Sequence, residues 1–284
     1  MAEWIIQLLN GFSFGFLLFL VSSGLSITFG LMGILNLAHG SFFMLGAYIG
    51  LSISRVTGNL FLSVLGAAIV VGFIGAGVER LLFRRLYRKR LEQVLVSFGL
   101  IYIFMDVCKF LWGLDDHAIE KPISLAGSVS IMGSSYPAYR LAVIVIGIAM
   151  AVGLWLFQEK TRWGAVIRAG VDDKQMVTGL GINIGLTSTL VFALGAFLAS
   201  FGGVIGAPFI GVSPGLDLEI LVPALIVVVV GGLGTLQGAI AGSLLIGIMD
   251  SFGKAMFPGL ALFTVYAIMV IILIIKPSGL LGRR

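Results

Sequence analysis

A polar interruption between two apolar runs places unusual side chains near the start of the chain. The stretch from Gly30 to Ser41 contains Asn36, His39 and Gly40. Lipid cannot form hydrogen bonds with the backbone N–H and C=O groups that a helix interruption leaves free. Such an interruption must therefore lie within protein, beside a cavity or at the surface. Polar groups there are costly unless they have a function. One interpretation is a loosened helix that lines a solute path, with these three residues as path candidates. The alternative is a cytoplasmic turn in which Asn36 caps a helix.

A second break late in the chain is rich in glycine. Gly231, Gly232 and Gly234 follow an apolar run, and the glycine spacing of 230–247 matches that of 29–46 to within one residue. Transporters built from two repeats place glycine-interrupted segments at matching positions beside the substrate path. We therefore treat these glycines as further path candidates. The alternative is that the forty glycines of the chain produce the match by abundance alone.

Charged residues inside or beside apolar runs could bind ions or pair with one another. Asp106 and Lys109 are three residues apart, on one face of a helix. We expect a buried pair in which the two charges neutralise each other and serve a structural role. The functional alternative is a site for a coupling ion or a proton. A similar i, i+4 pair, Asp250 and Lys254, stands near the end of a later span, and Asp217 and Glu219 stand at the start of one. That acidic pair could attract solutes or a partner, or simply favour a helix start.

A polar segment between two apolar runs, 158–184, has the features of a short exposed helix. Asp172 or Asp173 can cap a helix that continues to about Thr178. Gly179 and Gly181 can then end it before the next span. Spacing alone does not separate a docking element for a soluble partner from an ordinary tight turn. The candidate docking residues are Arg168, Asp172, Asp173, Lys174, Met176, Gly179, Gly181 and Ile182.

The motifs of several enzyme classes are missing from the sequence. It has no phosphate-cradling G-x-x-x-x-G-K-[ST], no H-E-x-x-H, no dinucleotide fingerprint and no G-x-S-x-G with triad partners. One cysteine and two histidines give no metal-ligand cluster of familiar spacing. We predict that the chain is not an enzyme and has no catalytic, cofactor or metal site. If ATP drives its function, another chain hydrolyses the ATP.

The elements that must position these residues are membrane helices. Of 284 residues, 59% are hydrophobic and 11% are charged, with a mean hydropathy of +1.12. A soluble domain has roughly 45–50% apolar and about 25% charged residues. Abundant glycine is typical of closely packed membrane helices. The sequence predicts an all-α polytopic membrane bundle that forms one domain over residues 1–284.

Nine apolar segments could cross the membrane, given that a span needs roughly 20 residues. The segment 41–54 is short, and 219–252 is divided only by glycines, so we predict about eight or nine transmembrane helices. The polar loop 114–138 could hold short strands or be a plain connector. The nine segments are 5–29, 41–54, 60–78, 94–113, 139–157, 185–206, 219–236, 237–252 and 259–275.

Basic residues gather in the loops 79–93 and 158–184 and in the C-terminal tail. Nine spans place all three regions on one side of the membrane. By the positive-inside rule that side is cytoplasmic, and the N-terminus lies outside. The formal charge of +5 then reflects topology and not nucleic-acid binding. We expect a multi-pass membrane protein with a cytoplasmic C-terminus.

Three motifs, given below in chain order, resemble those of the branched-chain amino-acid ABC permease family, and the likeness covers nearly the whole chain. The motifs indicate the family more strongly than they indicate the solute, because permeases for urea and short amides are similar. An acidic residue is common in relatives where Ser41 stands here. The motifs are Gly24 to Tyr48; Arg168-Ala169, Asp173, Gly181-Ile182-Asn183 and Phe192 to Val204; and Val229 to Thr235 with Gly238, Ala239 and Gly242.

The resemblance implies a permease subunit of the bacterial inner membrane that moves branched-chain or related amino acids by alternating access. It implies pairing with a homologous permease or with itself, two cytoplasmic ATPases that use ATP, and a periplasmic solute-binding protein. It also implies that Asp172 to Gly181 is the helix that couples the ATPases to the bundle. The competing hypothesis is a self-sufficient ion- or proton-coupled carrier or channel, with Asp106 and His39 as ion sites.

Overall fold

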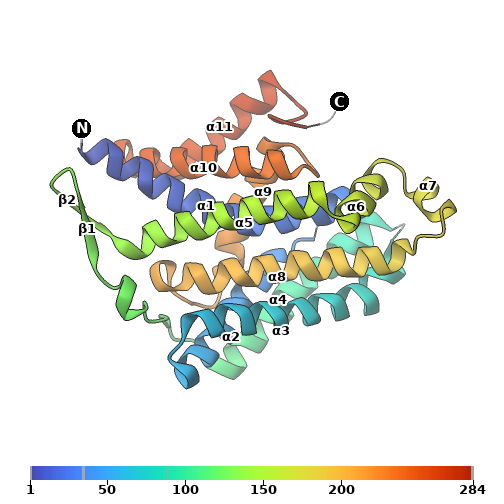
Figure 1. Cartoon of the computed structure of the whole chain (residues 1–284), viewed down its shortest axis with the longest axis horizontal. Helices are drawn as coiled ribbons and strands as arrows, with labels where there is room; N and C mark the ends of the chain where they lie inside the picture. Colours follow the sequence, from blue (N-terminus) through green and yellow to red (C-terminus); the bar gives the residue numbers. More distant parts are fainter. Residues whose placement is uncertain (1, 34–35, 88, 283–284) are drawn as a thin grey trace.

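The computed structural model describes residues 2–33, 36–87 and 89–282, and in this part of the chain it is a bundle of helices with one small hairpin (Figure 1). The basic residues Arg88, Arg283 and Arg284 lie outside the described residues. The helices are α1 (Ala2–Met32), α2 (His39–Thr57), α3 (Leu60–Leu81), α4 (Arg90–Trp112), α5 (Ala138–Lys160), α6 (Arg162–Asp172), α7 (Lys174–Gly179), α8 (Ile184–Ile210), α9 (Leu216–Gly231), α10 (Leu236–Met256) and α11 (Ala261–Ile275). Three short 3-10 turns are η1 (Phe83–Leu86), η2 (Ile123–Leu125) and η3 (Pro258–Leu260).

Each apolar segment of the sequence corresponds to one helix, which confirms the all-α membrane fold. Within the described residues, six helices are long and apolar enough to cross a membrane: α1, α3 continued through η1, α4, α5, α8 and α10. The remaining three, α2, α9 and α11, are 19, 16 and 15 residues long. The expected eight or nine helices are therefore present as helices, and six of them meet the length and hydropathy of a full span.

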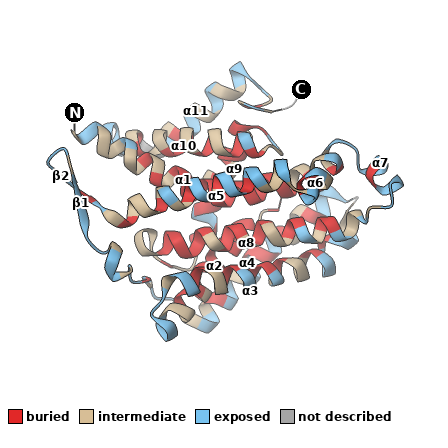
Figure 2. Cartoon of the chain, viewed as in Figure 1, coloured by how far each residue is buried: buried red, intermediate tan, exposed pale blue. Residues whose placement is uncertain are grey.

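Helix α1 lies at the centre of the bundle, against α8, α9, α10 and α5. Figure 2 shows buried residues concentrated in α1, α8 and α9, whereas the outward faces of α3 and α5 are exposed. Glycine permits close contact between α1 and α10: a Cβ atom at Gly11 would lie 2.7 Å from the Cα atom of Ile248 in α10. Small residues let membrane helices approach in this way, which explains the glycine content of the two helices.

The bundle has two distinct ends. We call one the basic end, formed by residues 82–87, 89–93, 158–184 and 276–282, and the other the hairpin end, formed by the start of α1 and residues 113–138 (Figure 1). The hairpin pairs β1 (Ser128–Ile131) with β2 (Ser134–Pro137) in antiparallel register. Its turn holds Met132 and Gly133 at φ of 51° and 83°. Short strands in this loop are thus confirmed, and the three basic regions meet at one end.

Candidate functional site

The N-termini of α2 and α9 meet in the interior of the bundle. The hydroxyl of Ser41 donates a hydrogen bond to Oδ2 of Asp217 over 3.0 Å, and Asp217 is 1% exposed. Gly40 lies against the same turn, because a Cβ atom there would overlap the carbonyl oxygen of Asp217. A carboxylate is stabilised near helix N-termini, where backbone N–H groups are free. The sequence identified Gly40 as a candidate but not its contact with Asp217.

Asn36 and His39 are both buried just before and at the start of α2. The Asn36 side chain accepts a hydrogen bond from the Ala38 N–H over 3.1 Å, so it does cap backbone, but inside the bundle and not at its surface. A ring nitrogen of His39 lies 3.0 Å from the carbonyl oxygen of Val21, within α1. Both side chains hold the start of α2 against the bundle. Their place on a solute path stays a prediction.

The start of the polar interruption, at Gly30, and the glycine break at 231–234 meet where α1 ends and α10 begins. A Cβ atom at Gly30 would lie 3.0 Å from the carbonyl oxygen of Gly234, whose φ is +79°. The C-terminal segment covers this contact, since the Leu281 N–H donates to the carbonyl of Gly231 over 2.9 Å. Gly232, at φ +111°, leaves no room for a side chain beside Gly282. The structure therefore places 231–234 against Gly30. His39 contacts α1 nearer its N-terminus, beside Gly24.

The predicted short helix of segment 158–184 is present as α7, preceded by α6. The Asp173 carboxylate accepts from the N–H groups of Gln175 and Met176 at 2.8 and 3.0 Å, which is the cap expected from the sequence. The helix ends at Gly179, and Gly181 has φ +80°. Met176 is 67% exposed, and Figure 1 shows α7 projecting from the basic end.

Helix α6 connects α7 to the bundle. A Cβ atom at Gly170 would lie 2.7 Å from Cδ1 of Leu31, so α6 is packed against the end of α1. The Arg168 guanidinium is 3.5 Å from the Glu159 carboxylate. Beside this pair is a cavity of 290 Å³ that is also lined by Gly234 and Thr235. Arg168 of the predicted docking segment and the second glycine break thus border one cavity.

A buried carboxylate that the sequence analysis did not single out secures the basic end. Glu79 of α3 is fully buried and accepts hydrogen bonds from the hydroxyls of Tyr87 and Thr189, the latter at 2.5 Å. These bonds tie α3 to the basic loop and to α8. Burial, and then the bond to Glu79, raise the pKa of Tyr87 above its ordinary value. A carboxylate at the end of an apolar run was the only signal for it.

The predicted ion pair of α4 forms, but it is not buried in this chain. Lys109 Nζ lies 3.5 Å from Oδ1 of Asp106, whose side chain is 73% exposed. Cys108, which lies between them in the sequence, is buried. The inward face of α4 is therefore the face of Cys108, and the ion pair faces away from the core. Among the described residues, no three of His, Cys, Asp and Glu are grouped as metal ligands.

A family model described as "Branched-chain amino acid transport system / permease component" matches residues 7–274. The chain is similar to the high-affinity branched-chain amino acid transport system permease protein BraD of Pseudomonas aeruginosa, at 27% identity over 99% of this chain and 96% of the relative. It is also similar to the permease protein LivH of Escherichia coli, named for the same kind of system, at 26% identity over 98% and 95% of the two chains.

A solved structure described as PsaBC from Streptococcus pneumoniae in complex with Fab has a similar fold. The TM-score is 0.55, with coverage of 98% of this chain and 96% of that one. Sequence identity is 15%, so this similarity concerns the arrangement of helices alone.

Proposed function

This chain belongs to the family of permease components of branched-chain amino acid transport systems, and from that premise we propose that it is the membrane-spanning subunit of an ABC importer for branched-chain or related amino acids. The family consists of transport permeases and not of enzymes. The whole chain, 1–284, then acts as one transmembrane domain. The aliphatic amino acids are the solute class because the similar proteins of Pseudomonas and Escherichia are named for them.

The basic end faces the cytoplasm in this proposal. Arg84, Arg85 and Lys89 of the first basic loop share this end with α6, α7 and the C-terminal segment. Positive residues are retained on the cytoplasmic side of inner-membrane proteins. The hairpin end then faces the periplasm, where a solute-binding protein delivers the amino acid.

Helix α7 serves as the docking element for a cytoplasmic ATPase. The observation that carries the proposal is its geometry: a helix capped by Asp173, bounded by Gly181 and presenting Met176 to solvent, on a stem packed against α1. Lys174 opens this helix, Gly179 closes it, and Ile182 donates its N–H back to Val177. A rigid projection of this kind transmits a displacement instead of absorbing it.

Motion of the docking element has a direct route to the glycine breaks. Arg168 of α6 and Gly234 border the same cavity, and Gly234 lies against Gly30. Closure of two ATPases on bound ATP would therefore shift the joint between α1 and α10 and alternate access between the two ends. Two permease subunits, identical or homologous, frame the path, and ATP is bound by the partner subunits.

The proposal is tested by reconstituting the chain in proteoliposomes with and without the ATPases that copurify with it. We expect uptake of L-leucine from its binding protein only when ATPases and ATP are present. Uptake by the chain alone under an ion gradient would contradict the importer and support the secondary carrier. Competition by urea or acetamide, without competition by L-isoleucine, would assign the amide type of solute instead.

A further inference from the structure

The hairpin end contains a second cavity, of 400 Å³, between α1, α5, α8, α9 and α10. Ligand pockets typically span about 300–1,000 Å³, so this volume suits a small solute. Its walls are mixed, with polar and charged side chains facing aromatic and aliphatic ones. The lining residues that matter here are Ser13, Phe14, Arg140, Phe209, Glu219 and Ile220.

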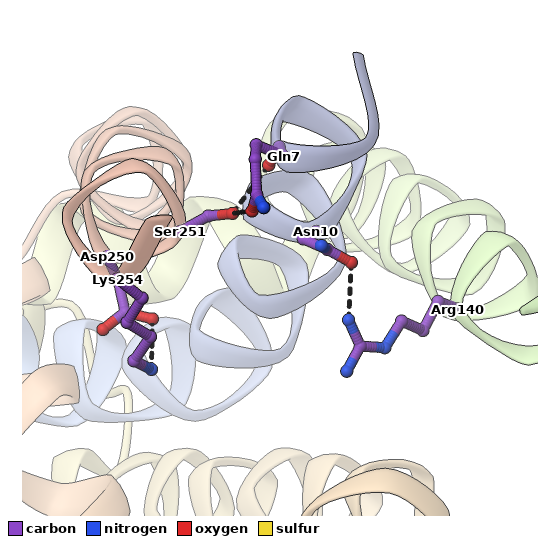
Figure 3. A network of polar contacts seen from close by, with 6 residues as sticks. All are labelled: Gln7, Asn10, Arg140, Asp250, Ser251 and Lys254. Atoms are coloured by element: carbon purple, nitrogen blue, oxygen red, sulfur yellow. Dashed lines mark hydrogen bonds and ion pairs between the residues drawn. The ribbon is translucent and has the colours of Figure 1, made fainter. Parts of the chain in front are cut away.

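Arg140 brings an uncompensated positive charge to this cavity. Its Nη1 atom donates to the Asn10 side chain over 2.5 Å, and its guanidinium lies 5.6 Å from the centre of the Phe209 ring. Figure 3 shows Arg140 reaching from α5 toward Asn10 on α1. Within residues 2–33, 36–87 and 89–282, no carboxylate is at ion-pair distance from it. A guanidinium has five donors in a planar fork that matches a carboxylate.

Glu219 brings an uncompensated negative charge to the same cavity. This exposed residue of α9 has no ion pair or hydrogen bond from its side chain among the described residues. The other charges on the wall neutralise each other, since Lys254 Nζ lies 2.6 Å from Oδ2 of Asp250 (Figure 3). Among the described residues that line the cavity, one cation and one anion, Arg140 and Glu219, therefore remain without an ion pair.

The lining of the same cavity also includes an unpaired polar atom and apolar side chains. The hydroxyl of Ser13 is buried, at 2% exposure for the residue, and has no hydrogen-bond partner in the described part of the chain. Buried polar groups are normally paired, so an unpaired one that lines a cavity indicates a bound group. Phe14, Phe209 and Ile220 supply apolar surface beside it.

We propose that this cavity binds the zwitterion of an aliphatic α-amino acid, as a subsite at the hairpin end of the bundle. The carboxylate of the ligand pairs with Arg140 and its ammonium group with Glu219. The hydroxyl of Ser13 donates to the carboxylate, and the aliphatic side chain lies against Phe14 and Ile220. This assignment rests on the proposed function and names where the solute first contacts the permease.

Protection of an introduced cysteine tests the subsite without any ATPase. Ile210 lines the cavity and is partly exposed, and the single native cysteine, Cys108, is buried. In Ile210→Cys chains in nanodiscs, L-leucine should slow labelling by a methanethiosulfonate reagent. We expect Arg140→Gln and Glu219→Gln each to weaken the apparent affinity for L-leucine about 10- to 100-fold, as expected when a charge-assisted pairing with the ligand is lost.

Two half-ligands identify which charge binds which end. Leucinamide has the ammonium group without a carboxylate, so its protection should survive Arg140→Gln and be lost in Glu219→Gln. The anion 4-methylpentanoate should show the reverse pattern. Retained binding of one half-ligand also shows that the variant is folded. Asp106→Asn, in the exposed pair of α4, is the control and should leave all three affinities unchanged.

Absence of protection by L-leucine up to its solubility would overturn the subsite, as would equal effects of both variants on the two half-ligands. Neither result touches the proposed function, which is decided by ATPase-dependent uptake. Conversely, protection together with uptake that needs no ATPase would support the subsite and refute the importer.

Discussion

Ser41 Oγ donates to Asp217 Oδ2 over 3.0 Å, and this bond joins two helices whose first turns are 176 residues apart in the chain. It lies where α2 and α9 both begin inside the bundle, with Gly40 packed against the same turn. The bond supplies a donor to Oδ2 of this buried carboxylate, while its Oδ1 accepts from the Leu218 N–H over 3.0 Å. The two helices therefore depend on each other for a satisfied start.

Replacing the donor should destabilise the fold. Ser41→Ala leaves Oδ2 of buried Asp217 without this hydroxyl, and an unpaired buried polar group costs about 1–3 kcal/mol. Thermal unfolding in detergent should show a lower midpoint than for Ser22→Ala. Ser22 is equally buried, but its hydroxyl bonds only within α1. Equal midpoints for the two variants would contradict a special role for the Ser41 bond.

A methyl group at Gly40 should be poorly tolerated. The new Cβ of Gly40→Ala would overlap the carbonyl oxygen of Asp217 and lie 2.9 Å from Cβ of Leu221. Overpacking of this kind costs about 1–3 kcal/mol. Gly77→Ala is the matched control, because nothing lies within 4 Å of the added carbon and alanine favours helix. We expect a lower unfolding midpoint for the first variant only; a similar change in both would refute the close approach.

The cap of α7 should control coupling to the ATPases. Asp173→Ala removes the acceptor for the N–H groups of Gln175 and Met176. This loss costs about 1 kcal/mol, or roughly fivefold in the equilibrium population of the folded helix. ATP hydrolysis stimulated by solute-loaded binding protein should fall by a similar factor, while membrane insertion is unchanged. Asp173→Ser keeps a capping oxygen and should keep most of the coupling. Full coupling in the alanine variant would exclude α7 as the docking element.

High pH should weaken the anchor of the basic loop. The pKa of Tyr87 is raised in the folded state, so the neutral phenol is the form that the fold stabilises. This contribution is complete below the ordinary pKa of about 10 and is lost as pH rises through the folded-state value. The stability advantage of the natural chain over Tyr87→Phe should therefore shrink above about pH 10. Denaturation of both chains across this range measures it, and a constant difference would refute the bond to Glu79.

Features that depend only on neighbouring residues could be predicted from the sequence alone. Long apolar runs identified each membrane helix, basic loops identified one end of the bundle, and an aspartate followed by two glycines identified α7 and its cap at Asp173. These signals are local because a helix, its cap and its hydropathy are defined within a few residues.

The burial of each polar group, and the partner it contacts, depend on how the helices pack. The Asp106–Lys109 pair formed as its spacing predicted, but its exposure depends on which face of α4 packs inward. The partner of Ser41, the bonds of Glu79 and the shared cavity of Arg140 and Glu219 likewise join distant segments. Contacts of this kind depend on which faces of distant helices pack together. The spacing of residues within one segment does not predict that packing.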